Sequence, residues 1–101
     1  MSYQELLDRM RFLTSKDGKT KTQRSLKLAE EMGELAAAVL SETNAPGCEY
    51  KELDESDVAE EACDVIIVAF SILSHYGFDD DLIKRELSNK LDKWERVCEC
   101  E

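Results

Sequence analysis

Two segments of the sequence combine closely spaced acidic residues with a strongly apolar surface. The first is KLAEEMGELAAAVL, from Lys27 to Leu40, and the second is DVAEEACDVIIVAFSIL, from Asp57 to Leu73. Apolar residues recur in both at the three- and four-residue spacing of an α-helix. The sequence therefore predicts two helices of this kind as the centre of an all-α fold.

The acidic residues of the two segments have the spacing of a shared site. Residues three or four apart lie on the same face of a helix, so Glu31 with Glu34 and Glu61 with Asp64 each form a pair of carboxylates. If the two helices lie side by side, the four carboxylates converge. Glu30 stands directly before the first pair.

Such a cluster of carboxylates repels itself unless a hard divalent cation binds at its centre. Mg²⁺ is the usual cation where a phosphate substrate completes the ligand shell, and Mn²⁺ is a possible substitute. The second segment continues as VIIVAFSIL, which is apolar almost all round, so its acids should lie at a covered seam. Because burying a carboxylate without a partner costs several kcal/mol, and few bases are near, we expect a metal-dependent enzyme that acts on a polyphosphate.

Taken alone, the first segment also fits an ordinary amphipathic helix with a solvated acidic face. At about 100° per residue, one half of its circumference carries Lys27, Glu30, Glu31 and Glu34. The other half is apolar and comprises Leu26, Leu28, Ala29, Met32, Leu35, Ala36, Val39 and Leu40. On this pattern the apolar half is expected to be the buried one.

Length and charge limit the kind of protein. The chain has 101 residues, enough for one domain over residues 1–101. Its 23 acidic against 13 basic residues give a net charge of −10, which argues against a DNA or RNA polymer as partner. The start MSYQELLDRMRF resembles no secretory leader, and no apolar run has transmembrane length. We therefore expect a cytoplasmic protein without a membrane partner.

The N-terminal half is predicted to contain two helices and a loop. The first helix should run from Tyr3 to about Leu13 with Ser2 as its N-cap. A polar loop should follow over residues 15–21, SKDGKTK. Thr22 is the expected N-cap of the second helix, which should run to about Ser41.

The C-terminal half is predicted to contain two further helices. After a connection over residues 42–56, the third helix should run over residues 55–76, with Asp54 or Ser56 as its cap. Gly77 should end it, with Phe78 as the hydrophobic partner of the stop. Residues 79–81, three aspartates, suit the start of a fourth helix that runs to about Val97.

The fourth helix carries amide and cationic residues that could bind a triphosphate. These are Asn89, Lys90, Lys93 and Arg96. The sequence does not distinguish such a role from ordinary surface decoration.

The four cysteines do not indicate a metal site. No two of the cysteines form a Cys-x-x-Cys pair; they are Cys48, Cys63, Cys98 and Cys100. His75 is the only histidine. Zinc binding is therefore not expected, and reduced thiols are the simpler interpretation.

Two short motifs carry a resemblance to a known family. Glu30-Glu31-Met32-Gly33-Glu34 matches the EExxE motif, and Glu61-Ala62-Cys63-Asp64 the ExxD motif, of the all-α nucleoside triphosphate pyrophosphohydrolases. The chain resembles a small MazG-like member from about Gln23 to Arg96. Asn89-Lys90-Leu91 resembles the (Asn/Asp)-Lys-Leu segment of the family.

The resemblance implies hydrolysis of a nucleoside triphosphate between the α and β phosphates, which yields a monophosphate and pyrophosphate. It implies Glu31, Glu34, Glu61 and Asp64 as Mg²⁺ ligands. Glu30 would be a further ligand or would orient the attacking water. The nucleotide would meet Asn89 and Lys90, with Lys27 and Arg96 as further candidates. Small relatives imply a homodimer or homotetramer in which neighbouring chains complete the pocket.

Two other interpretations are compatible with acidic helices. A carboxylate-bridged di-iron bundle also projects glutamates inward, but it requires Glu-x-x-His pairs, and position 64 is Asp here. A non-catalytic helical interaction module would use the acids only as a solubilising face. A metal site should gain thermal stability from Mg²⁺ or Mn²⁺, and a plain helical bundle should not.

Overall fold

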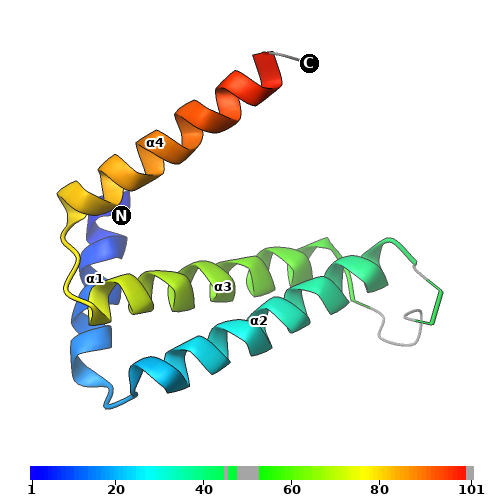
Figure 1. Ribbon diagram of the computed structural model, residues 1–101. Helices are drawn as coiled ribbons and strands as arrows, with labels where there is room; N and C mark the ends of the chain where they lie inside the picture. The colour runs from blue at the N-terminus through cyan, green and yellow to red at the C-terminus, as the bar shows by residue number, and fades with distance from the viewer. Residues whose placement is uncertain (45, 48–52, 100–101) are drawn as a thin grey trace.

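The computed structural model of the chain describes residues 1–44, 46–47 and 53–99. This part of the chain contains four helices and no strand, which confirms the predicted all-α fold (Figure 1). The helices are α1 (Tyr3–Lys16), α2 (Lys21–Glu42), α3 (Glu55–His75) and α4 (Asp80–Glu99). The predicted connection between the second and third helices lies partly outside the described residues.

Side-chain caps fix the starts of the first two helices. Ser2 accepts a hydrogen bond from the backbone N–H of Glu5, which confirms the predicted cap of α1. The prediction of Thr22 as the N-cap of α2 is wrong, since Thr20 is the N-cap. Thr20 and Gln23 form a reciprocal capping box that satisfies two backbone donors, so α2 begins one residue after Thr20. The loop between α1 and α2 is correspondingly shorter than predicted, because α1 continues to Lys16.

A side-chain cap begins α3, and a glycine turn ends it. Asp54 caps α3 and accepts from the backbone N–H groups of Ser56 and Asp57, as predicted for Asp54. At the other end Gly77 has φ +80°, a conformation that glycine adopts without a steric penalty. The N–H groups of Gly77 and Phe78 bond back to the carbonyls of Ser74 and Leu73. This Schellman motif ends α3 where the sequence predicted a stop.

The helices form an antiparallel pair with two additions. α2 and α3 lie side by side along most of their length, and α1 packs across α3 (Figure 1). α4 leaves the elbow after α3 and does not pack along any of the other three described helices. The elbow is held to α1, since Gln4 donates to Asp80, and Arg11 donates to the carbonyl of Phe78 and pairs with Asp80.

The face of α2 that packs on α3 differs from the predicted one. Glu31 is buried, together with Arg24, Ala38 and Ser41, whereas much of the apolar half faces outward. The exposed large side chains of that half are Leu26, Met32, Val39 and Leu40. The expectation that the apolar half is the buried one is therefore wrong within a single chain, because the contact with α3 is made by the neighbouring stripe.

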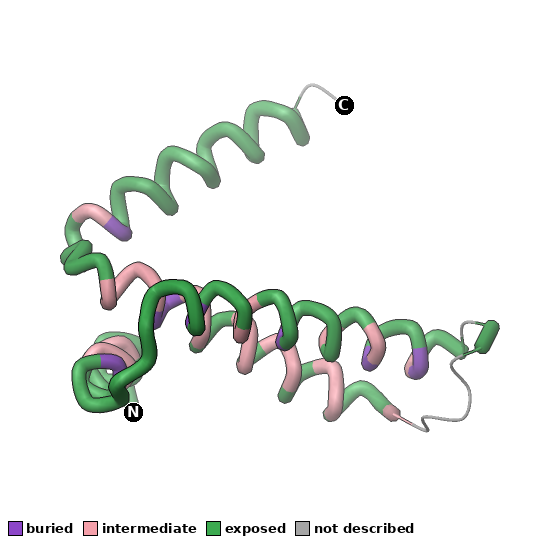
Figure 2. Tube along the Cα trace, turned by 60° about the horizontal axis from the view of Figure 1, so that its bottom comes forward, coloured by how far each residue is buried: buried purple, intermediate pink, exposed green. Residues whose placement is uncertain are grey.

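The chain buries few large apolar side chains by itself. Among the described residues only Ala38, Phe70 and Ile83 are buried hydrophobics, and α4 is exposed nearly throughout (Figure 2). Ile66 and Ile67 of α3 are also exposed, so a single chain does not cover this apolar helix on every side. None of the described helices combines the length and hydrophobicity that crossing a bilayer requires.

Candidate metal site

Three carboxylates converge between α2 and α3. Glu31 and Glu34 project from α2 and Glu61 projects from α3. One carboxylate oxygen of each lies within 4.8 Å of the others. The antiparallel packing of the two helices therefore brings together residues that are about thirty positions apart in the chain, as the spacing of the two motifs predicted.

The converging carboxylates are only partly compensated by protein groups. Glu31 is 6% exposed, and its Oε1 accepts from Lys27 Nζ at 3.0 Å. Its second oxygen and the Oε2 of Glu61 are buried, and no described residue donates a hydrogen bond to either. A buried carboxylate oxygen without a partner is costly. Lys27 therefore compensates only part of the site, and the described protein groups leave two buried carboxylate oxygens without a donor.

The electrostatics of Glu61 show the same imbalance. Desolvation raises the pKa of Glu61 above its usual range, and the negative charges of Glu34 and Asp64 raise it further. Both causes disfavour the ionised form. Protonation of Glu61 would relieve this imbalance, and a cation would relieve it without protonation.

The residues present fit a hard divalent cation. All three offer carboxylate oxygens, which Mg²⁺ and Mn²⁺ prefer over nitrogen or sulfur. Glu31 and Glu61 each carry an oxygen that no described residue engages, and a cation would satisfy both. Glu31, Glu34 and Glu61 would hold the ion.

Asp64 and Glu30 stand apart from this group. Asp64 is close enough to raise the pKa of Glu61, but it is not among the three converging residues. Glu30 is exposed and pairs with Lys27 at 3.4 Å. The structure thus brings together three of the four predicted ligands, with Asp64 at the margin.

Lys27 joins the cluster, although it was predicted as a nucleotide contact. Its hydrogen bond to Glu31 and the charge of Glu30 raise the pKa of the Lys27 ammonium above the ordinary value. The Lys27 ammonium therefore remains charged next to the carboxylates. Lys27 neutralises part of the negative charge of the cluster and leaves the buried Oε2 of Glu61 without a donor among the described residues.

The predicted nucleotide-binding residues of α4 do not reach the cluster within one chain. Asn89, Lys90 and Arg96 are exposed, and α4 does not pack along α2 or α3. Lys90 instead lines a hollow in the α3–α4 elbow, beside Leu73 and Phe78. Their predicted role therefore depends on a neighbouring chain.

A second buried polar site, centred on Arg24, was missed by the sequence analysis. The guanidinium is 4% exposed and donates to His75 Nδ1 at 2.8 Å, to the carbonyl of Thr14 at 3.2 Å and to Asp17 at 2.5 Å. Its hydrogen bond holds the pKa of Asp17 below the usual range. Helical spacing places Arg24 on one stripe of α2 with Leu28 and Glu31, one and two turns later. That this stripe packs against α3 is a tertiary choice, so the spacing alone did not reveal the site.

Comparison of the chain with protein-family models, with curated proteins and with solved structures gives no match.

Proposed function

We propose that the chain is a Mg²⁺-dependent nucleoside triphosphate pyrophosphohydrolase that produces a nucleoside monophosphate and pyrophosphate. The observation that carries the proposal is the convergence of Glu31, Glu34 and Glu61 with two buried oxygens left unpartnered. The EExxE and ExxD motifs, in that order on paired helices, support the same activity. A role in clearing unwanted nucleotides from the cytoplasmic pool would follow.

The proposed roles of the chain's own residues follow from their positions. Glu31, Glu34 and Glu61 would hold the metal, with Asp64 as a fourth ligand at the margin. A divalent cation, when bound, supplies positive charge for the triphosphate and activates water. Glu30 is exposed beside the cluster, where a carboxylate that is not a ligand could orient a water molecule and accept its proton. Lys27 would hold the Glu31 carboxylate in position through its ion pair.

The proposed substrate site needs more than one chain. The phosphates or the base would be bound by Asn89, Lys90 and Arg96. These residues lie on α4, which does not pack along the helices that carry the acidic cluster. A homodimer or homotetramer could bring α4 of one chain to the cluster of another. The large apolar surface that a single chain exposes supports such an assembly.

The test is pyrophosphate release by the purified chain from canonical and modified nucleoside triphosphates, with Mg²⁺ and with EDTA. We expect release that requires the metal. Glu34→Gln and Asp64→Asn should remove it while circular dichroism and oligomeric state stay unchanged. Glu60→Gln is the matched control, because Glu60 is exposed and precedes Glu61. Retained release in both cluster variants would refute the ligand assignment.

The alternative is a non-catalytic helical interaction module, which the wide exposed apolar surface also favours. Thermal melting with and without Mg²⁺ or Mn²⁺ separates the two functions. A ligand that binds only the folded state raises its stability by about 2.7 kcal/mol at a hundredfold excess over its Kd. An interaction module should show no comparable response to the metal.

A further inference from the structure

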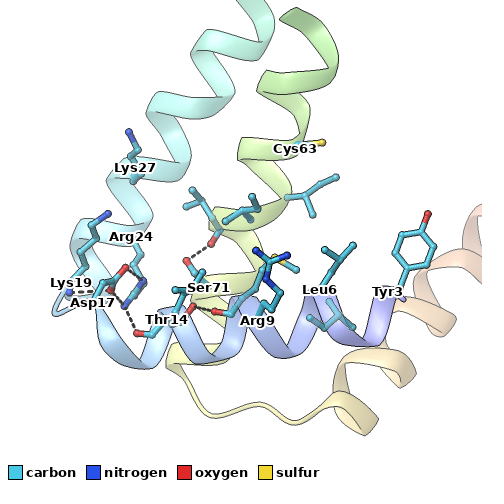
Figure 3. A pocket seen from close by; sticks show the side chains of 16 residues that line it. Tyr3, Leu6, Arg9, Thr14, Asp17, Lys19, Arg24, Lys27, Cys63 and Ser71 are labelled. Carbon is cyan, nitrogen blue, oxygen red and sulfur yellow. Dashed lines mark hydrogen bonds and ion pairs between the residues drawn. The ribbon is translucent and has the colours of Figure 1, made fainter. Parts of the chain in front are cut away.

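An apolar groove lies between α1 and α3, with basic residues at its margin. Its walls come from one face of α1 and from the exposed side of α3, and it encloses about 590 Å³ (Figure 3). The apolar walls include Leu6, Met10, Leu13, Ile66 and Ile67. Arg9 and Lys19 line it as well, with Asp17 as the one acidic lining residue, next to Lys19. Neither basic side chain forms an ion pair with any residue that the structure describes.

The exposed stripe of α4 has the complementary shape and charge. At about 100° per residue, Leu87, Leu91, Trp94 and Cys98 fall on one side of α4, and the first three are 51–66% exposed. Asp92, Glu95 and Glu99 lie along one flank of this stripe. Among the described residues these three acids form no ion pair, so they are available to a basic surface.

α4 does not cover the groove of its own chain. Arg11, Gln4 and Asp80 fix the elbow against α1, and from there α4 runs away from the other helices (Figure 1). The groove and the stripe therefore remain exposed together on every chain. A second copy brings both at once, so that each chain supplies a stripe and receives one, as two-fold symmetry requires.

We infer that the α1–α3 groove of one chain binds the α4 stripe of a second copy. The lengths agree, since the stripe from Leu87 to Cys98 spans about 17 Å and α1 spans about 21 Å at the rise of an α-helix. Trp94 is the anchor expected for such a contact, and the acidic flank of α4 meets the basic margin of the groove. This mode is a helix in a groove.

The outer face of α2 is a poorer match to the groove. It is also exposed, but Ala29, Gly33 and Ala36 make its middle flat. Its large exposed side chains, Leu26, Met32 and Leu40, lie around this flat middle and form a broad surface, which suits another helix surface better than a concave groove. The large side chains of α4 fill a groove, so α4 is the occupant that the shape selects.

The inference does not rest on the proposed enzymatic activity, and its test uses assembly alone. Sedimentation equilibrium of the full chain should show an oligomer. Leu13→Glu disrupts the groove and Leu91→Glu disrupts the stripe. Both side chains are more than half exposed in one chain, at 60% and 51%, so each variant should fold. Each should have at most half of the wild-type mass.

Mixing the two variants gives the decisive result. The intact α4 of Leu13→Glu can enter the intact groove of Leu91→Glu, so the mixture should form a mixed dimer although neither variant assembles in this way alone. Phe12→Glu is the matched control, since Phe12 adjoins Leu13, is 59% exposed and lies outside the groove. It should keep the wild-type mass.

Three results would overturn the inference. One is a wild-type chain that stays monomeric at all concentrations. Another is wild-type mass in either Leu13→Glu or Leu91→Glu, which would mean that the groove or the stripe is not used. The third is failure of the mixture to form mixed dimers while circular dichroism shows both variants folded, which would place the two residues in separate contacts. Pyrophosphate release is not read in any arm, so failure here is distinct from failure of the proposed activity.

Discussion

The α2–α3 pair contains two buried polar sites that are built in opposite ways. At one site, Arg24 has its donors matched by His75, Thr14 and Asp17. At the other, Glu31 and Glu61 each bury an oxygen with no donor among the described residues. Protein groups supply the hydrogen-bond partners of the first site, whereas they leave two buried oxygens of the second site without one.

The difference separates a structural role from a functional one. Arg24 on α2 is a buried charge whose partners lie on α3, on α1 and at the C-cap of α1. It therefore fixes the arrangement of these three helices, and removing it leaves the partners unsatisfied. Buried carboxylates without partners lower the stability of the metal-free fold, and a bound cation would offset this cost. Under the proposed function, the acidic cluster is the place where stability is given up for cation binding.

The largest expected effect is on activity at the acidic cluster. Glu61→Gln should lower Mg²⁺-dependent pyrophosphate release by about 100-fold or more, given that changes even to outer partners of metal ligands cost 10–100-fold. In EDTA the same variant should be more stable than wild type, because it removes the most disfavoured charge. Activity assays and urea unfolding in EDTA measure the two effects. Lower stability in EDTA would mean that Glu61 has a protein partner and that the two sites do not differ as described.

The next effect is on stability at the Arg24 site. Arg24→Met keeps much of the apolar stem but leaves the Thr14 carbonyl and Asp17 without their donor. It should cost about 2–3 kcal/mol in the free energy of unfolding. Urea unfolding measures the loss, and the melting-temperature gain from Mg²⁺ should persist. Loss of that gain in a folded Arg24→Met protein would show that the two sites are coupled.

A smaller effect is the pH dependence, which should have opposite signs at the two sites. The pKa of Glu61 is raised above 4.5, so its contribution to metal-free stability is fully present below pH 4.5 and is lost as pH rises through the higher native pKa. The pKa of Asp17 is lowered below 3.8. Its contribution is present above pH 3.8 and is lost as pH falls through the native pKa.

The pH dependence is measured by urea unfolding in EDTA from pH 3 to 8. Wild type minus Glu61→Gln isolates the first contribution, and wild type minus Asp17→Asn isolates the second. The account requires the two difference curves to slope in opposite directions. Parallel curves would remove the distinction between the sites.

The sequence predicted the helices better than their contacts. Local signals placed Ser2, Asp54 and Gly77 at helix ends, because capping depends on nearby backbone groups. The prediction of Thr22 as the cap of α2 was wrong, because Thr20 forms a capping box with Gln23 and the helix begins earlier. Which stripe of α2 faces α3 is a tertiary choice, and the hydrophobic pattern gave the wrong side since much of that apolar surface is left uncovered in a single chain.

The candidate site was predictable to a similar degree. Helical spacing placed Glu31 with Glu34, and pairing of the helices then brought Glu61 to them. The Arg24 site could not be assembled from the sequence, because His75 and Thr14 reach it from helices whose crossing is set by packing. The positions of Asn89 and Lys90 relative to the cluster depend on a second chain, which one sequence does not fix.

The central claim is that the carboxylates of α2 and α3 form a divalent-cation site, and calorimetric titration with Mn²⁺ or Mg²⁺ tests it most directly. EDTA-stripped wild type and Glu60→Gln should bind the ion alike, whereas Glu34→Gln and Glu61→Gln should bind it at least about tenfold more weakly. Undetectable binding by the folded wild type, or equal affinity in all four proteins, would contradict the account.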